Sequence, residues 1–294
     1  MRAKTRIPLP LNWVLVLALG FYLTAPGLSA PVESGFLVVK YGDESASPEL
    51  AAEFLEKLAT FLGAPIDRGP LKGWIANTPA EAARILRDAH PILLLGPPGL
   101  YLELELQQQL PMEVLVQVPR MGATSERYVL VAPKKSELSV ENLRGELVRT
   151  VFAFDRTYLE RVVFPASFQP GVDFQLEPST NMADEIFLLL EVPEESAASA
   201  LLLDTELALF FQQDDMVWPE LKVVWQSEEL PRDLVVAVGS EWTSTEIQRL
   251  KRHLLGMKDD PGGAEILELM SSDGLVPCNF ELLERARAKY RRSP

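Results

Sequence analysis

The chain alternates short apolar runs with longer amphipathic runs, and this alternation constrains its fold more than any other feature. Gly35–Gly42 and Pro91–Gly96 are mostly apolar and end on glycine, which is typical of buried strands. Between them, Ser47–Gly63 repeats leucine and phenylalanine at helical spacing, begins with Ser-Pro and ends on glycine. Strands that alternate with helices of this length predict an α/β fold with mostly parallel sheets.

The predicted strands fall into two series. The first series has about four strands, and the second has about five before a further strand near the C-terminus. Two sheets, and therefore two lobes, follow more naturally than one very wide sheet. In chain order the predicted strands are Gly35–Gly42, Leu71–Asn77, Pro91–Gly96, Glu113–Val118, Arg127–Pro133, Leu147–Phe154, Val172–Pro178, Ser199–Asp204, Leu221–Ser227 and Asp233–Gly239.

Two polar, turn-rich segments mark where the chain crosses between the lobes. They are Val118–Arg127 and Gln226–Asp233. If both are crossings, residues 31–122 and 232–294 together form lobe one, and residues 123–231 form lobe two. The prediction is a receptor with a discontinuous first lobe and a cleft between the lobes.

The N-terminus has the order of regions of a secretory signal peptide. Residues 1–6 supply three positive charges, an apolar run follows from Leu11 to Ala25, and small residues precede Pro31. The apolar run is short for a membrane-spanning helix. We predict a signal peptide over residues 1–30, cleaved after Ala30 or Ser29, and a periplasmic location. An uncleaved membrane anchor is the alternative.

Charge and composition exclude several functional classes. The 28 Lys and Arg against 42 Asp and Glu give a net charge of −14, which disfavours nucleic acid as a partner. Cys278 is the single cysteine, and His90 and His253 are not at metal-ligand spacing. Motifs for a nucleophile elbow, a phosphate-binding loop or a zinc protease are absent from the sequence. We therefore expect no catalysis, no cofactor and no bound metal.

Four segments, in their order and approximate spacing, carry a family resemblance. They are Ser47–Gly63, Ile92–Glu103, Arg127–Phe154 and Trp225–Gly239. Together they resemble the phosphate/phosphonate-type periplasmic substrate-binding proteins of ABC importers. The most specific pieces are Ser136–Val148, similar to that family's entry into lobe two, and Ser227–Asp233, similar to its return hinge.

The resemblance implies a type II periplasmic-binding fold that closes on a small oxyanion or phosphonate-like ligand and delivers it to an ABC permease. It also implies ligand contacts at the ends of strands. These fall on Tyr41, Gly99, Tyr101, Arg156, Thr157, Thr180, Asn181 and Asp204.

Helix capping is the competing explanation for several of these residues. Asp155 stands at an N-cap position and would repel a phosphonate. Asn181 and Asp204 also precede predicted helices, so capping alone accounts for them. A carboxylate at Asp204 is also suited to bind an amine, as in aminophosphonates or amino acids.

A second function, from a different class, is open at this stage. A ligand-blind relative would use the same fold to contact a membrane sensor. The two functions differ in the cleft: a receptor needs a polar cleft, whereas an interaction module would fill it with Phe154, Tyr158 or Phe164.

Overall fold

The computed structural model describes residues 34–41, 47–66, 71–179, 181–191 and 198–292. The signal peptide predicted for residues 1–30 lies outside these ranges. Within them, no helix is both long enough and apolar enough to cross a membrane.

The first sheet has the strand order β2-β1-β3-β10-β4. β1 pairs in parallel with β2 and β3, whereas β10 is antiparallel to both β3 and β4. The strands are β1 (Gly35–Val39), β2 (Lys72–Ala76), β3 (Leu93–Gly96), β4 (Met112–Gln117) and β10 (Leu234–Val238).

The second sheet has the strand order β7-β6-β8-β5-β9. β6 pairs in parallel with β7 and β8, and β5 is antiparallel to β8 and β9. Its strands are β5 (Val129–Pro133), β6 (Leu147–Thr150), β7 (Gln175–Pro178), β8 (Ala200–Leu203) and β9 (Leu221–Gln226). Each sheet therefore contains one antiparallel strand among parallel ones, and the predicted α/β class is confirmed.

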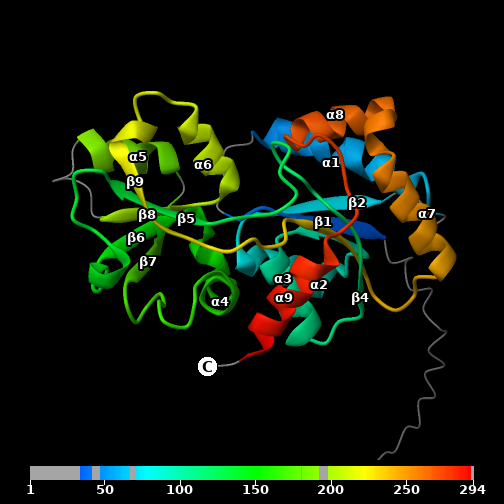
Figure 1. Cartoon of the computed structure of the whole chain (residues 1–294). Helices are drawn as coiled ribbons and strands as arrows, with labels where there is room; N and C mark the ends of the chain where they lie inside the picture. Colours follow the sequence, from blue (N-terminus) through cyan, green and yellow to red (C-terminus); the bar gives the residue numbers. More distant parts are fainter. Residues whose placement is uncertain (1–33, 42–46, 67–70, 180, 192–197, 293–294) are drawn as a thin grey trace, which may run out of the picture. The chain divides into compact units, whose positions relative to one another are not determined.

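Helices cover both faces of the first sheet (Figure 1). Successive residues of a strand point to opposite faces. Accordingly, Phe36 and Val38 belong to the core under α1 (Pro48–Gly63), α7 (Ser244–Leu255) and α8 (Pro261–Leu269). Leu37 and Val39 belong to the core under α2 (Pro79–Ala89), α3 (Pro98–Leu106) and α9 (Phe280–Arg291).

The second sheet is covered in the same way. Val129 and Val131 share a core with α5 (Met182–Glu191) and α6 (Thr205–Gln212). Leu130 and Ala132 face α4 (Arg156–Tyr158) and the π-helical turn η3 (Leu159–Val163). Their core is continuous with the one under α3 and α9, so buried side chains of both sheets belong to one cluster.

The chain crosses from the first sheet to the second between Gln117 and Val129, and returns between Gln226 and Leu234. The two crossings are hydrogen-bonded to each other. The Glu126 N–H donates to the Leu230 carbonyl at 2.8 Å, and the Leu230 N–H donates to the Glu126 carbonyl at 2.9 Å. The predicted lobe boundaries at residues 122/123 and 231/232 fall inside these crossings and stay predictions.

Several predicted strands are shorter in the structure, and two of them show why. The strand predicted for Leu147–Phe154 ends at Thr150, because the Thr150 hydroxyl accepts the Phe152 N–H and begins the 3₁₀ helix η2 (Val151–Asp155). The strand predicted from Val172 begins at Gln175, because the Asp173 carboxylate accepts the Gln169 N–H in a preceding turn. The remaining short helical turns are η1 (Val140–Asn142), η4 (Trp218–Glu220) and η5 (Met257–Asp259).

Candidate ligand-binding site

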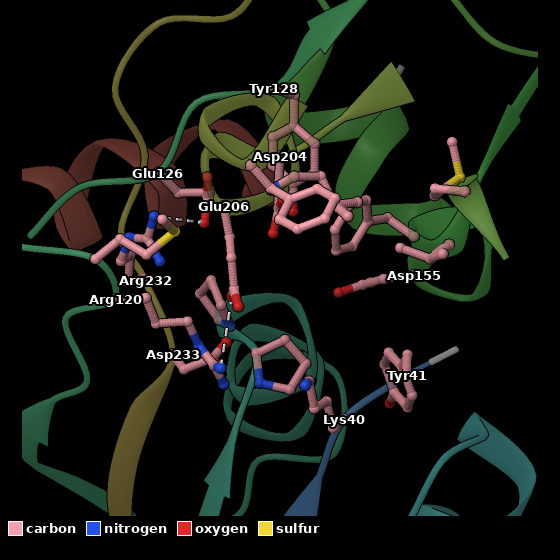
Figure 2. Close-up of a pocket in the computed structure, with 18 of the residues that line it drawn as sticks. Lys40, Tyr41, Arg120, Glu126, Tyr128, Asp155, Asp204, Glu206, Arg232 and Asp233 are labelled. Atoms are coloured by element: carbon pink, nitrogen blue, oxygen red, sulfur yellow. Dashed lines mark hydrogen bonds and ion pairs between the residues drawn. The ribbon is translucent and has the colours of Figure 1, made fainter. Parts of the chain in front are cut away.

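A cavity of about 810 Å³ lies where the strand ends of both sheets meet the two crossings (Figure 2). Its walls come from the end of β1, the turn between β3 and α3, the end of β6, and the starts of α5 and α6. In open α/β sheets, ligands bind outside the carboxyl ends of the strands, which is the position of this cavity. Its volume is in the range of small-molecule sites.

Three of the predicted ligand-binding residues line the cavity: Tyr41, Asn181 and Asp204. Two of them also cap helices. The Asp204 carboxylate accepts the Leu207 N–H at 2.8 Å, and the Asn181 side-chain oxygen accepts the Ala183 N–H at 3.1 Å. Capping and a position in the cavity wall are therefore compatible for both residues.

Tyr101 does not line the cavity. Its ring is 2% exposed, its hydroxyl donates to Glu105 at 2.7 Å, and Arg287 on α9 donates to it at 2.6 Å. The guanidinium of Arg287 also binds both carboxylate oxygens of Glu105 at 2.8 Å. Tyr101 therefore joins α3 to α9 instead of lining the cavity, and its contact with a ligand stays a prediction.

The other predicted residues are also absent from the cavity wall. Arg156 forms an ion pair with Glu160 at 2.6 Å, and its side chain is 55% exposed. Thr157 is partly buried beside it, and Gly99 is buried in the first turn of α3. Thr180 lies outside the described residues.

Asp155 is a cavity residue whose role the sequence did not indicate. The sequence favoured it as a helix cap. Its carboxylate has no well-formed capping hydrogen bond, but the backbone N–H of Tyr158 in α4 is close enough to lower its pKa against the larger effect of burial. The carboxylate also lies against Gly99, where an added Cβ atom would overlap both carboxylate oxygens. Figure 2 shows Asp155 pointing into the cavity near Tyr41. The second sheet's helical turn η2 thus contacts the first turn of α3.

Two arginines from the crossings also line the cavity, and the sequence pattern did not predict them as site residues. Arg120 lies 3.1 Å from Asp233 and 3.6 Å from Glu206. Arg232 lies 3.5 Å from Glu126, and its Nε donates to the Ser125 carbonyl at 3.0 Å. Both arginines lie within the segments predicted as crossings, and that placement was the signal that could have identified them.

Burial changes the acidity of the carboxyl groups in the cavity. Burial, with a smaller contribution from the charge of Glu103, raises the pKa of Asp155 to about 7. Burial and the charge of Glu126 raise the pKa of Asp204 to about 8. The described wall contains five carboxylates (Glu126, Asp155, Asp204, Glu206 and Asp233) and three basic side chains (Lys40, Arg120 and Arg232).

The cavity is open to a solute. Phe154, Tyr158 and Phe164, the residues that would fill the cleft of a ligand-blind relative, do not line it, and Tyr158 and Phe164 are each 2% exposed. Among the residues the structure describes, no group of His, Cys, Asp and Glu is arranged to hold a metal ion.

The two sheets are covered by helices, are joined by two crossings and have a cavity at their strand ends. This architecture is that of a solute receptor with the type II periplasmic-binding fold. The structure is similar to a Xanthomonas citri protein, XAC2383, solved with chloride (15% identity, 88% of this chain and 98% of that chain, TM-score 0.66). It is also similar to PhnD1 of Prochlorococcus marinus, solved with methylphosphonate (16% identity, 90% of this chain and 98% of that chain, TM-score 0.60). A third similar structure is a binding protein component of an ABC phosphonate transporter from Pseudomonas aeruginosa (14% identity, 88% of this chain and 87% of that chain, TM-score 0.59).

The sequence profile of the family described as "ABC transporter, phosphonate, periplasmic substrate-binding protein" matches residues 36–282. The chain therefore belongs to this family, and its role is that of a solute-binding protein for an ABC importer. No curated protein matches the sequence of this chain.

Proposed function

We propose that this chain binds one small solute in the cavity between its sheets and presents the closed complex to an ABC permease. The observation that carries the proposal is the open cavity of about 810 Å³ at the strand ends of both sheets. Side chains from both sheets and both crossings line it, so a ligand held there contacts both lobes at once.

The two crossings are the proposed hinge, with lobe one over residues 31–122 and 232–294 and lobe two over residues 123–231. Two backbone hydrogen bonds between Glu126 and Leu230 hold the crossings together, and the ion pair of Arg232 with Glu126 lies beside them. Hinge motions in such receptors are absorbed by a few residues at element ends.

The proposed location is the periplasm, reached through a signal peptide over residues 1–30. The charges and apolar run at the N-terminus support this proposal, as does the periplasmic description of the family. Mass spectrometry of the protein purified from an expressing cell would give a chain that begins at Ala30 or Pro31. A chain that keeps Leu11–Ala25 would favour a membrane anchor.

The charge of the solute stays a prediction. The resemblance implies an oxyanion or a phosphonate-like compound, whereas the carboxylate at Asp204 left an amine open. Lys40 and Arg120 are candidate partners for an anionic group, since both line the cavity.

A thermal-shift screen of purified full-length protein tests the receptor role. The solutes are phosphate, sulfate, methylphosphonate, amino acids and small amines. A solute that binds only the folded protein raises the melting temperature. Ala183→Trp, which places a bulky ring in the cavity wall, should abolish the shift, and Ala83→Trp on the exposed face of α2 should not. A shift that survives Ala183→Trp would contradict the proposal.

A further inference from the structure

Most of the charged groups in the cavity wall have a partner within the protein. Arg120 is placed between Asp233 and Glu206, and Arg232 is paired with Glu126. Asp204 is engaged as the N-cap of α6. An added oxyanion would have to compete with these carboxylates for the two arginines.

Asp155 differs from Glu126, Glu206 and Asp233, which are paired with arginines, and from Asp204, whose carboxylate accepts the Leu207 N–H of α6. No Lys or Arg in the described part of the chain forms an ion pair with it, and its neighbour Arg156 is paired with Glu160. Figure 2 shows Asp155 and Tyr41 at one side of the view, and Arg120 and Arg232 at the other. A carboxylate in a protein interior without a cation is costly.

The position of Asp155 also bears on which ligands fit. Its carboxylate lies against Gly99 in the first turn of α3, a helix with no side-chain cap. A helix N-terminus attracts anions. Here the protein's own carboxylate already lies there, so an oxyanion at the same end of the cavity would meet a negative charge.

The walls near Asp155 suit an organic cation. The rings of Tyr128 and Phe152 line the cavity and contact each other edge to face at 5.2 Å, and Tyr41 lines it close to Asp155. Aromatic faces attract ammonium groups, most strongly where water is excluded. A carboxylate beside aromatic walls therefore offers charge and shape complementarity to a substituted ammonium group.

We propose, on the basis of the receptor role above, that the solute carries a cationic nitrogen and that Asp155 is its counter-ion. The ligand class is an organic ammonium compound, whose positive charge lies at the α3 end of the cavity where an oxyanion would otherwise bind.

Calorimetric titration of purified full-length protein at pH 8 tests this proposal. The cationic probes are choline, tetramethylammonium and putrescine, and the neutral probe is 3,3-dimethylbutan-1-ol, which has the shape of choline without its charge. Methylphosphonate and phosphate are the oxyanion probes. We expect at least one cation to bind, with the neutral alcohol weaker than choline if choline is that cation. Asp155→Asn should weaken cation binding about tenfold or more, as for other desolvated charge pairs. Asp88→Asn, on the exposed face of α2, removes the same charge and should have no effect.

A second readout does not depend on the choice of probe. If the ligand supplies the missing positive charge, the empty protein carries a buried carboxylate without a cationic partner, and Asp155→Asn should raise its melting temperature at pH 8. Binding of oxyanions alone, unchanged or strengthened in Asp155→Asn, would overturn the inference and leave the receptor role intact. No shift with any probe, together with a lower melting temperature for Asp155→Asn, would overturn both.

Discussion

The carboxylate of Asp155 lies against Gly99. Asp155 is the last residue of η2, which follows a strand of the second sheet, and Gly99 is in the first turn of α3, which follows a strand of the first sheet. The contact requires that residue 99 has no side chain, because a Cβ atom would occupy the space of the carboxylate. The two residues are therefore in contact across one end of the cavity.

Gly99→Ala tests this contact. We expect a loss of about 1–3 kcal/mol in the free energy of unfolding, as for other overpacked sites. In an Asp155→Ala background the same change should be neutral or stabilising, since alanine favours the helix over glycine by about 1 kcal/mol. Chemical denaturation of the four proteins of this cycle measures the coupling. Equal costs in both backgrounds would show that the two residues do not interact.

The network of Tyr101, Glu105 and Arg287 should matter for stability and not for binding. Arg287→Met removes the arginine partner of Glu105 in a largely buried place, leaves it the hydrogen bond from Tyr101, and should cost about 3 kcal/mol. Tyr101→Phe removes a hydroxyl and should cost about 1 kcal/mol. Denaturant titrations measure both values, with Arg285→Met on the exposed face of α9 as the control. A weaker ligand affinity of the Tyr101→Phe protein would contradict this prediction and show that Tyr101 contributes to ligand binding.

The ion pair at the crossings gives a third prediction. The Arg232 side chain is 2% exposed, and Glu126 accepts the Thr205 N–H at 2.7 Å as well as contacting Arg232. Arg232→Met should cost about 3–5 kcal/mol, because it leaves a buried carboxylate unpaired. Adding Glu126→Gln should recover part of this loss.

A surface pair provides the matched comparison for this prediction. Arg127 and Glu229 are 2.9 Å apart but 43% and 48% exposed, so Arg127→Met should cost no more than about 1 kcal/mol. Similar costs for Arg232→Met and Arg127→Met in denaturant unfolding would contradict the importance of the buried pair.

Stability should fall as pH rises through neutrality. The pKa values of Asp155 and Asp204 are raised to about 7 and about 8, chiefly by burial, whereas an unfolded aspartate titrates near 4. The folded protein therefore binds protons more tightly than the unfolded chain. The stability from each group is complete below its unfolded pKa and is lost as pH rises through its folded pKa. The free energy of unfolding of the empty protein, measured from about pH 5 to pH 8, should decrease.

Substitution by asparagine at residues 155 and 204 separates the pH dependence that these two carboxyl groups cause from that of other titrating groups. Asn cannot titrate, and it caps a helix about as well as Asp, so Asp204→Asn keeps the cap of α6. Asp155→Asn and Asp204→Asn should each flatten the pH profile. A wild-type profile that rises across this window would contradict the account.

The fold could be predicted from the sequence because its strongest signals are local. Residues 92–96 form an apolar run closed by Gly-Pro-Pro, and this run became β3 followed by α3. The two polar segments near residues 120 and 230 could be recognised as crossings because they lack the regular spacing of apolar residues that is typical of a strand or a helix. The strand predicted through Phe154 failed because the Thr150 hydroxyl starts a helical turn that side-chain hydrophobicity does not reveal.

The site was only partly predictable, because it depends on directions and contacts between distant residues. Tyr41 and Asp204 could be placed at strand ends by position alone. The direction of Tyr101 is set by Arg287 from the C-terminal helix, and nothing near Tyr101 in the sequence indicates this. In the same way, the position of Asp155 depends on the missing side chain of Gly99.

A crystal structure of the protein with the solute that gives the largest thermal shift would show directly where the solute binds. We predict density for the solute inside the cavity, in contact with Tyr41 from the first sheet and with residues at the start of α6 from the second. Density at any other place on the molecule, with the cavity empty, would contradict this prediction.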